Sequence, residues 1–490
     1  MDTNRTATFR ATQIFGLCFY LAWMYLVFNG TASINVNLRT GWVLLWVHIV
    51  SSVFGVSTYL LIILFSRAAV KRFATRRSLV IAGVIMAAGT ALSTVPVAIP
   101  DVARLAGAAL TGVASCWIIV YWGSLFSSLT PRNIIVCTAA SFFFAFLIYY
   151  GSMQLPYVAR YGVEIVLPLA ASLLLPRVSN VSAVLGGPNP LLAETPDEQA
   201  RLTIEGKGGE EAGGRMLVPL RDLPWRIGVG LLIVMFVYGG VRVYVGMADY
   251  QESDALLPTL LMSVGVTVVA ALWGLFFTKG TVSLGAAYKM ALPFLATTLL
   301  VLDIFGYQSA ALVAPLATAC DVTIEVLSWI LLADIARTTR VPAFLVFAIG
   351  RGAVQLGMFA GQLLAMGLID QRAPFAIISV FVLMIAAGFL FTDQDTELVF
   401  QAPSQQERAA LEQKTGAPFE TRLDTVARQV GLTPRETEIF KLWATGHGSK
   451  YIQETYVISA ATVKTHVRHI YEKCGVHSRA EIISLLEEGE

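Results

Sequence analysis

Charged residues are scarce in this chain: they make up 14% of its 490 residues, whereas soluble proteins carry roughly 25%. The shortage is concentrated in the first 395 residues, where long apolar runs stand instead. So little charge excludes an ordinary soluble globular protein over that stretch. It predicts a segment that crosses a lipid bilayer many times.

Cysteine and histidine are also few, with five of each. No two cysteines have the spacing of a metal site or a redox pair, and the histidines gather in the tail at spacings unlike metal motifs. No catalytic combination of side chains stands out. The sequence therefore predicts no metal, no cofactor and no enzymatic activity. The cysteines are Cys18, Cys116, Cys137, Cys320 and Cys474.

Twelve apolar runs are candidates to span a bilayer, which takes about 20 residues of helix. The predicted fold class is therefore all-α, with a polytopic membrane bundle of about 12 helices in two groups of six. The runs are 11–28, 41–65, 78–99, 104–127, 133–153, 157–176, 226–246, 256–278, 284–303, 309–333, 342–369 and 374–392.

Polar segments divide the chain into domains. Residues 177–225 contain GGPNP, ETPDEQ and KGGEEAGG, a composition that cannot bury a core and predicts a flexible cytoplasmic linker. Spans 1–6 then occupy residues 1–176, and spans 7–12 occupy 226–393. Residues 394–431 are predicted to be a cytoplasmic tether that holds a short helix over 421–430. Residues 432–490 are predicted to form a separate domain.

Basic residues orient the bundle. The loop 66–77 carries five Lys and Arg residues and no acid, while segment 247–254 carries three acids and no base. Because basic loops stay inside, the first is expected in the cytoplasm and the second outside. Twelve spans then place both the N- and the C-terminus in the cytoplasm. The expected location of the chain is the inner membrane of a bacterium.

Ionisable side chains inside the spans cost about 2.5–3.5 kcal/mol each at the bilayer centre. Asp321 and Glu325 stand four residues apart in span ten, Arg351 and Gln355 do so in span eleven, and Arg242 lies late in span seven. We predict that these five residues line a ligand cavity, where Arg242 or Arg351 neutralises the acids or helps to hold the ligand. The alternatives are a structural ion pair and an Arg242 side chain that reaches the outer interface.

Two small residues in span eleven, Gly357 and Gly361, stand four positions apart. This spacing predicts a close approach between neighbouring helices.

The last 60 residues have the pattern of a small helical domain. Thr433 and Glu436 form a capping box at the start of one helix, and Ser459 caps another that Gly475 ends. Four helices are expected, beginning near residues 434, 449, 460 and 479. The third presents long hydrogen-bond donors on one face, from Lys464, Thr465 and Arg468, as a helix that enters the major groove of DNA must do.

The segments LTPRE (432–436), TVKTHV (462–467) and GVHSRAE (475–481) resemble the LuxR/GerE family of transcription regulators, and the match extends over about 50 residues. The resemblance implies a helix-turn-helix whose third helix reads base edges through Lys464, Thr465 and Arg468. Phosphates are the expected contacts of a second set of residues. This set consists of Lys450, Ser459, Thr462 and His466.

The DNA-binding segment is electrically balanced. Residues 432–488 contain seven Lys and Arg residues and seven Asp and Glu residues. Because phosphate neutralisation dominates DNA affinity, one copy should bind weakly, which predicts a homodimer on double-stranded DNA.

Two six-helix halves joined by a long connection resemble the major facilitator superfamily of transporters. The loop after the second span, SRAAVKRFATRRS (66–78), lacks the glycines and the aspartate of that superfamily's loop motif. This departure argues against active transport.

The two resemblances together favour a membrane-bound one-component transcription regulator. A small molecule would bind the transporter-like membrane domain and so control DNA binding by the tail. The alternative is an active secondary transporter with a regulatory DNA-binding tail, in which Asp321 and Glu325 carry protons or cations. A third possibility is a membrane half that only anchors the tail and senses a partner protein or the state of the bilayer.

Overall fold

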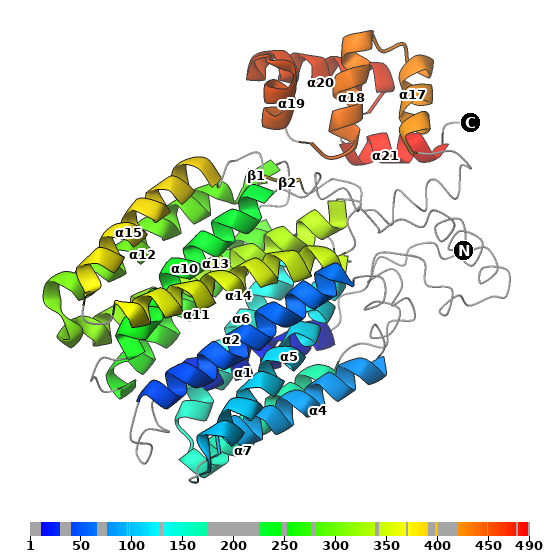
Figure 1. Cartoon of the computed structure of the whole chain (residues 1–490). Coiled ribbons are helices and arrows are strands. Elements are labelled where there is room, and N and C mark those ends of the chain that lie inside the picture. Colours follow the sequence, from blue (N-terminus) through cyan, green and yellow to red (C-terminus); the bar gives the residue numbers. More distant parts are fainter. Residues whose placement is uncertain are drawn as a thin grey trace.

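The computed structural model describes two helical bodies, a large bundle and a smaller C-terminal body (Figure 1). The structural statements below concern the residues that it describes. These are 11–29, 41–65, 76–95, 97, 99–127, 129, 131–174, 225–246, 252–276, 281–338, 343–368, 371–390, 397–399, 419–447, 449–476 and 479–488.

A helix stands in each of the twelve apolar runs. The N-terminal half contains α1 (Ala11–Asn29), α2 (Gly41–Leu64), α4 (Arg76–Ser93), α5 (Asp101–Phe126), α6 (Pro131–Met153) and α7 (Tyr157–Leu173). The C-terminal half contains α10 (Trp225–Gly246), α11 (Glu252–Phe276), α12 (Gly285–Phe305), α13 (Ala310–Thr338), α14 (Ala343–Gly367) and α15 (Arg372–Ile385). A short 3₁₀ turn, η4 (Tyr307–Ser309), precedes α13, and a π-helical turn, η5 (Ala386–Leu390), continues α15.

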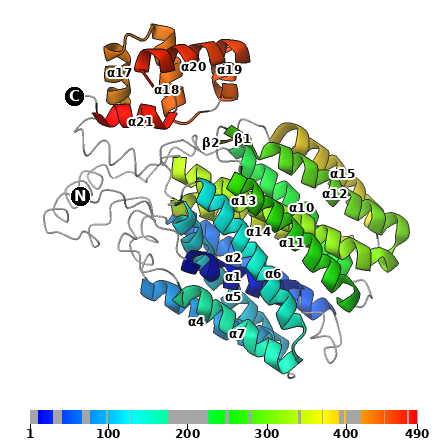
Figure 2. The same ribbon diagram turned by 180° about the vertical axis from the view of Figure 1, so that it is seen from behind.

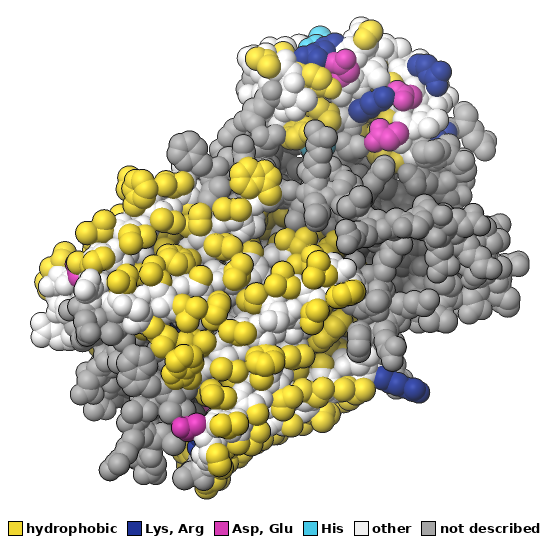
Figure 3. All heavy atoms as spheres, viewed as in Figure 1, with side chains coloured by type: hydrophobic (Ala, Val, Ile, Leu, Met, Phe, Trp, Pro, Cys, Tyr) yellow, Lys and Arg dark blue, Asp and Glu magenta, His cyan; other side chains and the backbone are white. Residues whose placement is uncertain are grey.

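Eight of these helices, counted over the described residues, are long and apolar enough to cross a membrane. The apolar stretches in α1, α4 and the α15 region are shorter, and α7 carries both Arg160 and Glu164. On the face shown in Figure 3 the bundle surface is almost entirely hydrophobic, while charged side chains gather on the smaller body. The bundle is thus a polytopic membrane domain, and its count of twelve spans stays a prediction.

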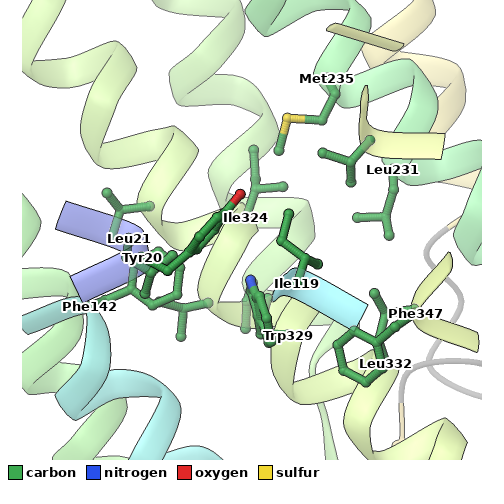
Figure 4. Close-up of a cluster of buried hydrophobic side chains, with 14 of the residues drawn as sticks. Tyr20, Leu21, Ile119, Phe142, Leu231, Met235, Ile324, Trp329, Leu332 and Phe347 are labelled. Atoms are coloured by element: carbon green, nitrogen blue, oxygen red, sulfur yellow. The ribbon is translucent and has the colours of Figure 1, made fainter. Parts of the chain in front are cut away.

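The two halves of the bundle meet along two helix pairs. Helix α2 packs against α14, and α6 packs against α11, which lie side by side when the bundle is seen from behind (Figure 2). Buried side chains from both halves form one continuous core, in which Ile119 of α5 lies near Trp329 of α13, and Leu332 near Phe347 of α14 (Figure 4). Both halves therefore share one interior at their interface.

Helices α10 and α14 approach each other closely within the C-terminal half. A Cβ atom on Gly357 would collide with the carbonyl oxygen of Leu232, and one on Gly361 with that of Phe236. The small-residue pair that the sequence singled out is confirmed as a backbone contact between helices.

A two-stranded ribbon departs from the all-helical expectation. Strand β1 (Thr281–Ser283), between α11 and α12, pairs antiparallel with β2 (Glu397–Val399), beyond α15. The four helices α12–α15 lie between the two strands in the sequence, so an even number of passes returns the chain to the end of the bundle at which it started. The ribbon therefore fixes the segment that leads to the tail at the same end of the bundle as the loop before α12.

Two predicted segments lie largely outside the described residues. One is the predicted linker, 177–225, and the other is the basic loop 66–77.

The C-terminal body has its own hydrophobic core, built by five helices. The four expected ones are α18 (Pro434–Ala444), α19 (Ser449–Tyr456), α20 (Ala460–Cys474) and α21 (Arg479–Glu488). The fifth, α17 (Phe419–Gln429), stands where a short helix was expected over 421–430, and it buries Phe419, Leu423, Val426 and Ala427 in that core. The folded body thus begins at Phe419, within the stretch that the sequence assigned to a tether, because those four apolar residues share one helix face.

The glycine contact gives a stability prediction. Gly361→Ala places a methyl group against the Phe236 carbonyl and forces α10 and α14 apart, at a cost of about 1–3 kcal/mol. We expect the thermal unfolding midpoint of the purified chain in detergent to fall by several degrees. Gly265→Ala in α11 is the matched control, because nothing lies within 4 Å of its added Cβ. Equal midpoints for the two variants would contradict the close contact.

Candidate DNA-binding face and membrane cavity

Helix α18 begins with the capping box that the sequence predicts. Thr433 Oγ1 accepts from the backbone N–H of Glu436 at 3.3 Å, and a Glu436 carboxylate oxygen accepts from the backbone N–H of Thr433 at 2.8 Å. The same carboxylate oxygen accepts from Lys473 Nζ at 2.7 Å. Because Lys473 stands in the last turn of α20, this carboxylate ties the end of that helix to the start of α18.

The charge of Glu436 is stabilised where it stands. Partial burial works to raise the pKa of its carboxyl group, but the hydrogen bonds from Lys473 and Thr433 outweigh it and lower the pKa from 4.5 to about 2.

Helix α20 separates an apolar face from a polar one. Ser459 caps it by accepting from the backbone N–H of Thr462 at 3.1 Å, and Gly475 ends it in the left-handed conformation, with φ 66°. The side chains of Val463, Val467 and Ile470 lie in the core of the C-terminal body. This burial fixes the rotation of the helix, and in Figure 1 α20 lies on the side of the body opposite α21.

The three residues predicted to contact bases lie together on the exposed face of α20. Lys464, Thr465 and Arg468 are all exposed. Thr465 donates to the backbone carbonyl of Ala461 at 3.0 Å, and Arg468 lies 3.6 Å from Glu472 in an ion pair that is open to solvent. Exposed ion pairs of this kind contribute about 0–1 kcal/mol, so the guanidinium of Arg468 can turn to another acceptor at little cost.

The four residues predicted to contact phosphates are spread over two helices. Ser459 and Thr462 share a hydrogen bond of 2.8 Å at the N-terminus of α20, and His466 is half-buried one turn further on. Lys450 belongs to α19, and its side chain lies outside the described residues. The N-terminus of α20 offers backbone N–H groups to an anion, so a phosphate at this end would be favoured.

In the membrane domain, six helices from both halves enclose a cavity of about 60 Å³. The helices are α1, α2 and α5 of the N-terminal half and α10, α13 and α14 of the C-terminal half. The structure brings all five of the residues predicted to line a cavity to this one place. They are Arg242, Asp321, Glu325, Arg351 and Gln355.

Only one of the two acids that line the cavity, Glu325, has an ionic partner. Arg351 donates to Glu325 at 2.5 Å, with both side chains less than 10% exposed, and its guanidinium lies 5.7 Å from the ring centre of Trp329. Buried charges require partners of this kind, because an isolated one costs several kcal/mol in desolvation. The expected structural ion pair and the expected cavity are therefore both present, and Glu325 belongs to both.

Asp321 is buried without a direct ionic partner, and the charges of Arg242 and Arg351 act on it only at longer range. Its Oδ2 lies 3.5 Å from the hydroxyl of Tyr25, and its Oδ1 has no hydrogen-bond partner. Within the described part of the chain, no cationic side chain lies within 4 Å of this carboxylate.

Arg242 turns toward the opposite half of the bundle. Its Nη2 donates to the backbone carbonyl of Phe28 on α1, and its Nη1 faces the sulfur of Met358 at 3.9 Å. Gln355 likewise crosses to the other half, where its amide donates to Ser52 Oγ at 2.8 Å. Both side chains line the cavity, and Arg242 does not form an ion pair with the acids that it was expected to neutralise.

Several cavity residues gave no signal in the sequence. Tyr20, Tyr25, Tyr59 and Tyr238 line the wall. Tyrosines are frequent in every membrane bundle, so no local pattern distinguishes those that face a cavity. Only the arrangement of helices distant in the sequence brings them together.

Comparison with known proteins agrees with the geometry of the tail. Residues 430–486 match the family described as bacterial regulatory proteins, luxR family. The tail is therefore a LuxR-type helix-turn-helix domain, a class that binds DNA.

The curated relatives include two bacterial regulatory proteins. The chain is 35% identical over 103 residues to the nitrate/nitrite response regulator protein NarL of Escherichia coli K12, which covers 20% of this chain and 48% of NarL. It is 32% identical over 123 residues to the oxygen regulatory protein NreC of Staphylococcus aureus MRSA252, which covers 24% of this chain and 50% of NreC. The chain thus spans about half the length of the curated relatives that it matches.

Solved structures resemble the membrane domain. The human organic anion transporter MFSD10 superposes with a TM-score of 0.51 at 13% identity, over 78% of this chain and 98% of that one. The proton:xylose symporter XylE superposes with a TM-score of 0.51 at 15% identity, over 77% and 94%. At such identities the likeness shows the fold alone, which is that of the major facilitator superfamily. Neither this fold nor the LuxR-type domain belongs to a class of enzymes.

The buried ion pair gives a prediction for the cavity. Glu325→Gln leaves the Arg351 guanidinium buried without a counter-charge and should destabilise the purified chain by about 3–5 kcal/mol. Adding Arg351→Gln should restore much of that loss, because no lone charge then remains. Thermal unfolding of the two single variants and the double variant measures the coupling. Additive losses would mean that the two charges do not act as a pair.

The capping carboxylate gives a pH prediction. Because the pKa of Glu436 is lower in the folded tail than in the unfolded chain, its contribution to stability is complete above about pH 5 and is lost as the pH falls toward 2. Glu436→Gln should therefore lower the stability of a 419–490 fragment at pH 7. It should also flatten the decline of stability between pH 5 and pH 2, measured by urea unfolding. Glu438→Gln, at an exposed position of the same helix, is the control. A decline as steep in Glu436→Gln as in the native fragment would assign the pH dependence to other groups.

Proposed function

We propose that this chain is a membrane-bound one-component transcription regulator. A transporter-like membrane domain senses a small molecule and controls DNA binding by the LuxR-type tail. The observation that carries the proposal is the joining, in one polypeptide, of a LuxR-type domain to a bundle that encloses a polar cavity.

The exposed face of α20 supports a role for Lys464, Thr465 and Arg468 at base edges. Their donors point away from the core of the C-terminal body, and burial of the opposite helix face holds them at one rotation. Ser459, Thr462, His466 and Lys450 would then hold the phosphates beside the groove. Since the module carries no excess of positive charge, two copies are expected to share one operator.

The cavity supports ligand sensing. It is bounded by both halves of the bundle, so a ligand that fills it contacts elements from each half at once. A ligand shifts a conformational equilibrium only if it binds the two states with different affinity. A site that is divided between two halves changes shape whenever they move, so it meets that condition.

The tether is the element through which such a movement would reach the tail. The β1–β2 ribbon joins the residues after α15 to the loop before α12, so the start of the tether moves with the C-terminal half. A cytoplasmic location for this end of the bundle, and for both termini, follows from the basic loops and from the need of the tail to reach DNA.

One observation favours the alternative, an active transporter with a regulatory tail. Asp321 is a buried carboxylate with an unpartnered oxygen, a feature that can carry a proton or a cation through a membrane. Proton or cation flux through the purified chain in vesicles, abolished by Asp321→Asn, would support this alternative.

Transcript profiling tests the proposed function. Cells that express the Lys464→Ala/Arg468→Ala double variant should lose the expression changes that the native chain causes in a defined group of genes, because two donors to base edges are gone. The control is Arg428→Ala, which removes an exposed cation from α17, away from the α20 face. Transcript levels that are the same with the native chain and with the double variant would refute the regulator and leave the transporter.

A further inference from the structure

The charges that line the cavity sum to zero, but they are not all paired. Glu325 and Arg351 neutralise each other at 2.5 Å. Asp321 and Arg242 also have opposite charges, yet each makes its contacts with neutral groups: a tyrosine hydroxyl for Asp321, and a backbone carbonyl and a thioether for Arg242. The cavity therefore contains one negative and one positive site that interact at longer range but form no ion pair with each other.

The two sites are close but form no ion pair. Tyr238, one turn before Arg242 on α10, interacts electrostatically with Asp321, and the charge of Arg242 acts on Asp321 at longer range. A molecule between the two would meet an acceptor at one end and donors at the other.

Each site has free hydrogen-bonding capacity. Asp321 Oδ1 has no partner, and the carboxylate is buried. On Arg242, the Nη1 group faces only the sulfur of Met358, a weak acceptor. A buried, unpartnered carboxylate oxygen that lines a cavity calls for a donor, and an ammonium group supplies the strongest one.

We propose that the sensed molecule is a small zwitterion, with its ammonium group against Asp321 and its carboxylate against Arg242. This inference rests on the proposed function, since it names the ligand class of the same cavity. A zwitterion leaves the summed charge of the cavity at zero, whereas a simple cation or anion would leave a net charge in a low-dielectric interior.

The size of the cavity sets the size of the ligand. A cavity of about 60 Å³ is larger than a single water requires. It has room for a small molecule, and the shortest zwitterions, glycine and alanine, are the first candidates. The rings of Tyr25 and Tyr238 lie beside Asp321 and can attract the ammonium end.

Titration calorimetry on the purified full chain in detergent tests the proposal with matched probes. L-alanine carries both charges, propionate lacks the ammonium group, and alaninamide lacks the carboxylate. We expect L-alanine to bind at least about tenfold more tightly than either analogue, because each analogue leaves one buried charge unmatched. Glycine, β-alanine and γ-aminobutyrate extend the series in length. Equal affinity for L-alanine and its analogues, or no binding by any zwitterion of the series, would overturn the proposal.

Two variants assign the ends of the ligand. Asp321→Asn should abolish the preference for L-alanine over propionate, and Arg242→Gln the preference over alaninamide. Asp303→Asn in α12 and Arg77→Gln in α4 remove matching charges outside the cavity and should leave both preferences intact. If a cavity variant does not fold, Asp321→Glu or Arg242→Lys keeps the charge and should keep the preference. A loss that is equal for all three probes would indicate general damage and count against the assignment.

The calorimetry and the transcript profiling can fail independently of each other. Selective binding of a zwitterion without any change in transcripts would leave the ligand class standing and refute regulation. Transcript changes without selective binding of a zwitterion would support regulation and refute the ligand class.

Discussion

The cost of placing charge in a low-dielectric interior is the constraint on which the membrane domain depends. Glu325 and Arg351 can stand in the middle of apolar helices because they face each other at 2.5 Å. That pairing holds α13 and α14 at fixed rotations and turns their polar faces inward. The same rotation directs Asp321 and Gln355, one turn away on each helix, toward the centre of the bundle. The cavity is thus a consequence of satisfying charges in a lipid environment.

In the tail, a different carboxylate has a similar organising role. Glu436 closes the cap of α18 and also receives Lys473 from the far end of α20. Helix α20 is therefore fixed at one end by its own cap at Ser459 and at the other by a bond to α18. Helix α17 packs against α18 and α21 and extends the same core. An exposed row of donors is useful for reading DNA only when it is held this firmly, because hydrogen bonds to base edges tolerate little displacement.

Sequence reasoning located what depends on local pattern. Caps at Thr433 and Ser459, the glycine contact at Gly357 and Gly361, and the four helices of the tail could all be predicted, since each depends on residues within a few turns of one another. Helix α17 was placed in a tether because its four apolar residues stand in a polar surrounding. The pairing of Arg351 with Glu325 and not with Asp321, and the turn of Arg242 toward Phe28, depend on how helices from distant parts of the chain approach each other. No spacing in the sequence contains that information.

The placement of the ion pairs bears on how easily the bundle can change shape. Glu325–Arg351 and Asp334–Arg337 both join residues of the C-terminal half. The polar contacts that cross between the halves at the cavity are single hydrogen bonds, from Arg242 to Phe28, Tyr25 to Asp321 and Gln355 to Ser52. Each such bond has a net value of roughly 0.5–3 kcal/mol. A rocking motion of one half against the other would break these three hydrogen bonds and leave both ion pairs intact.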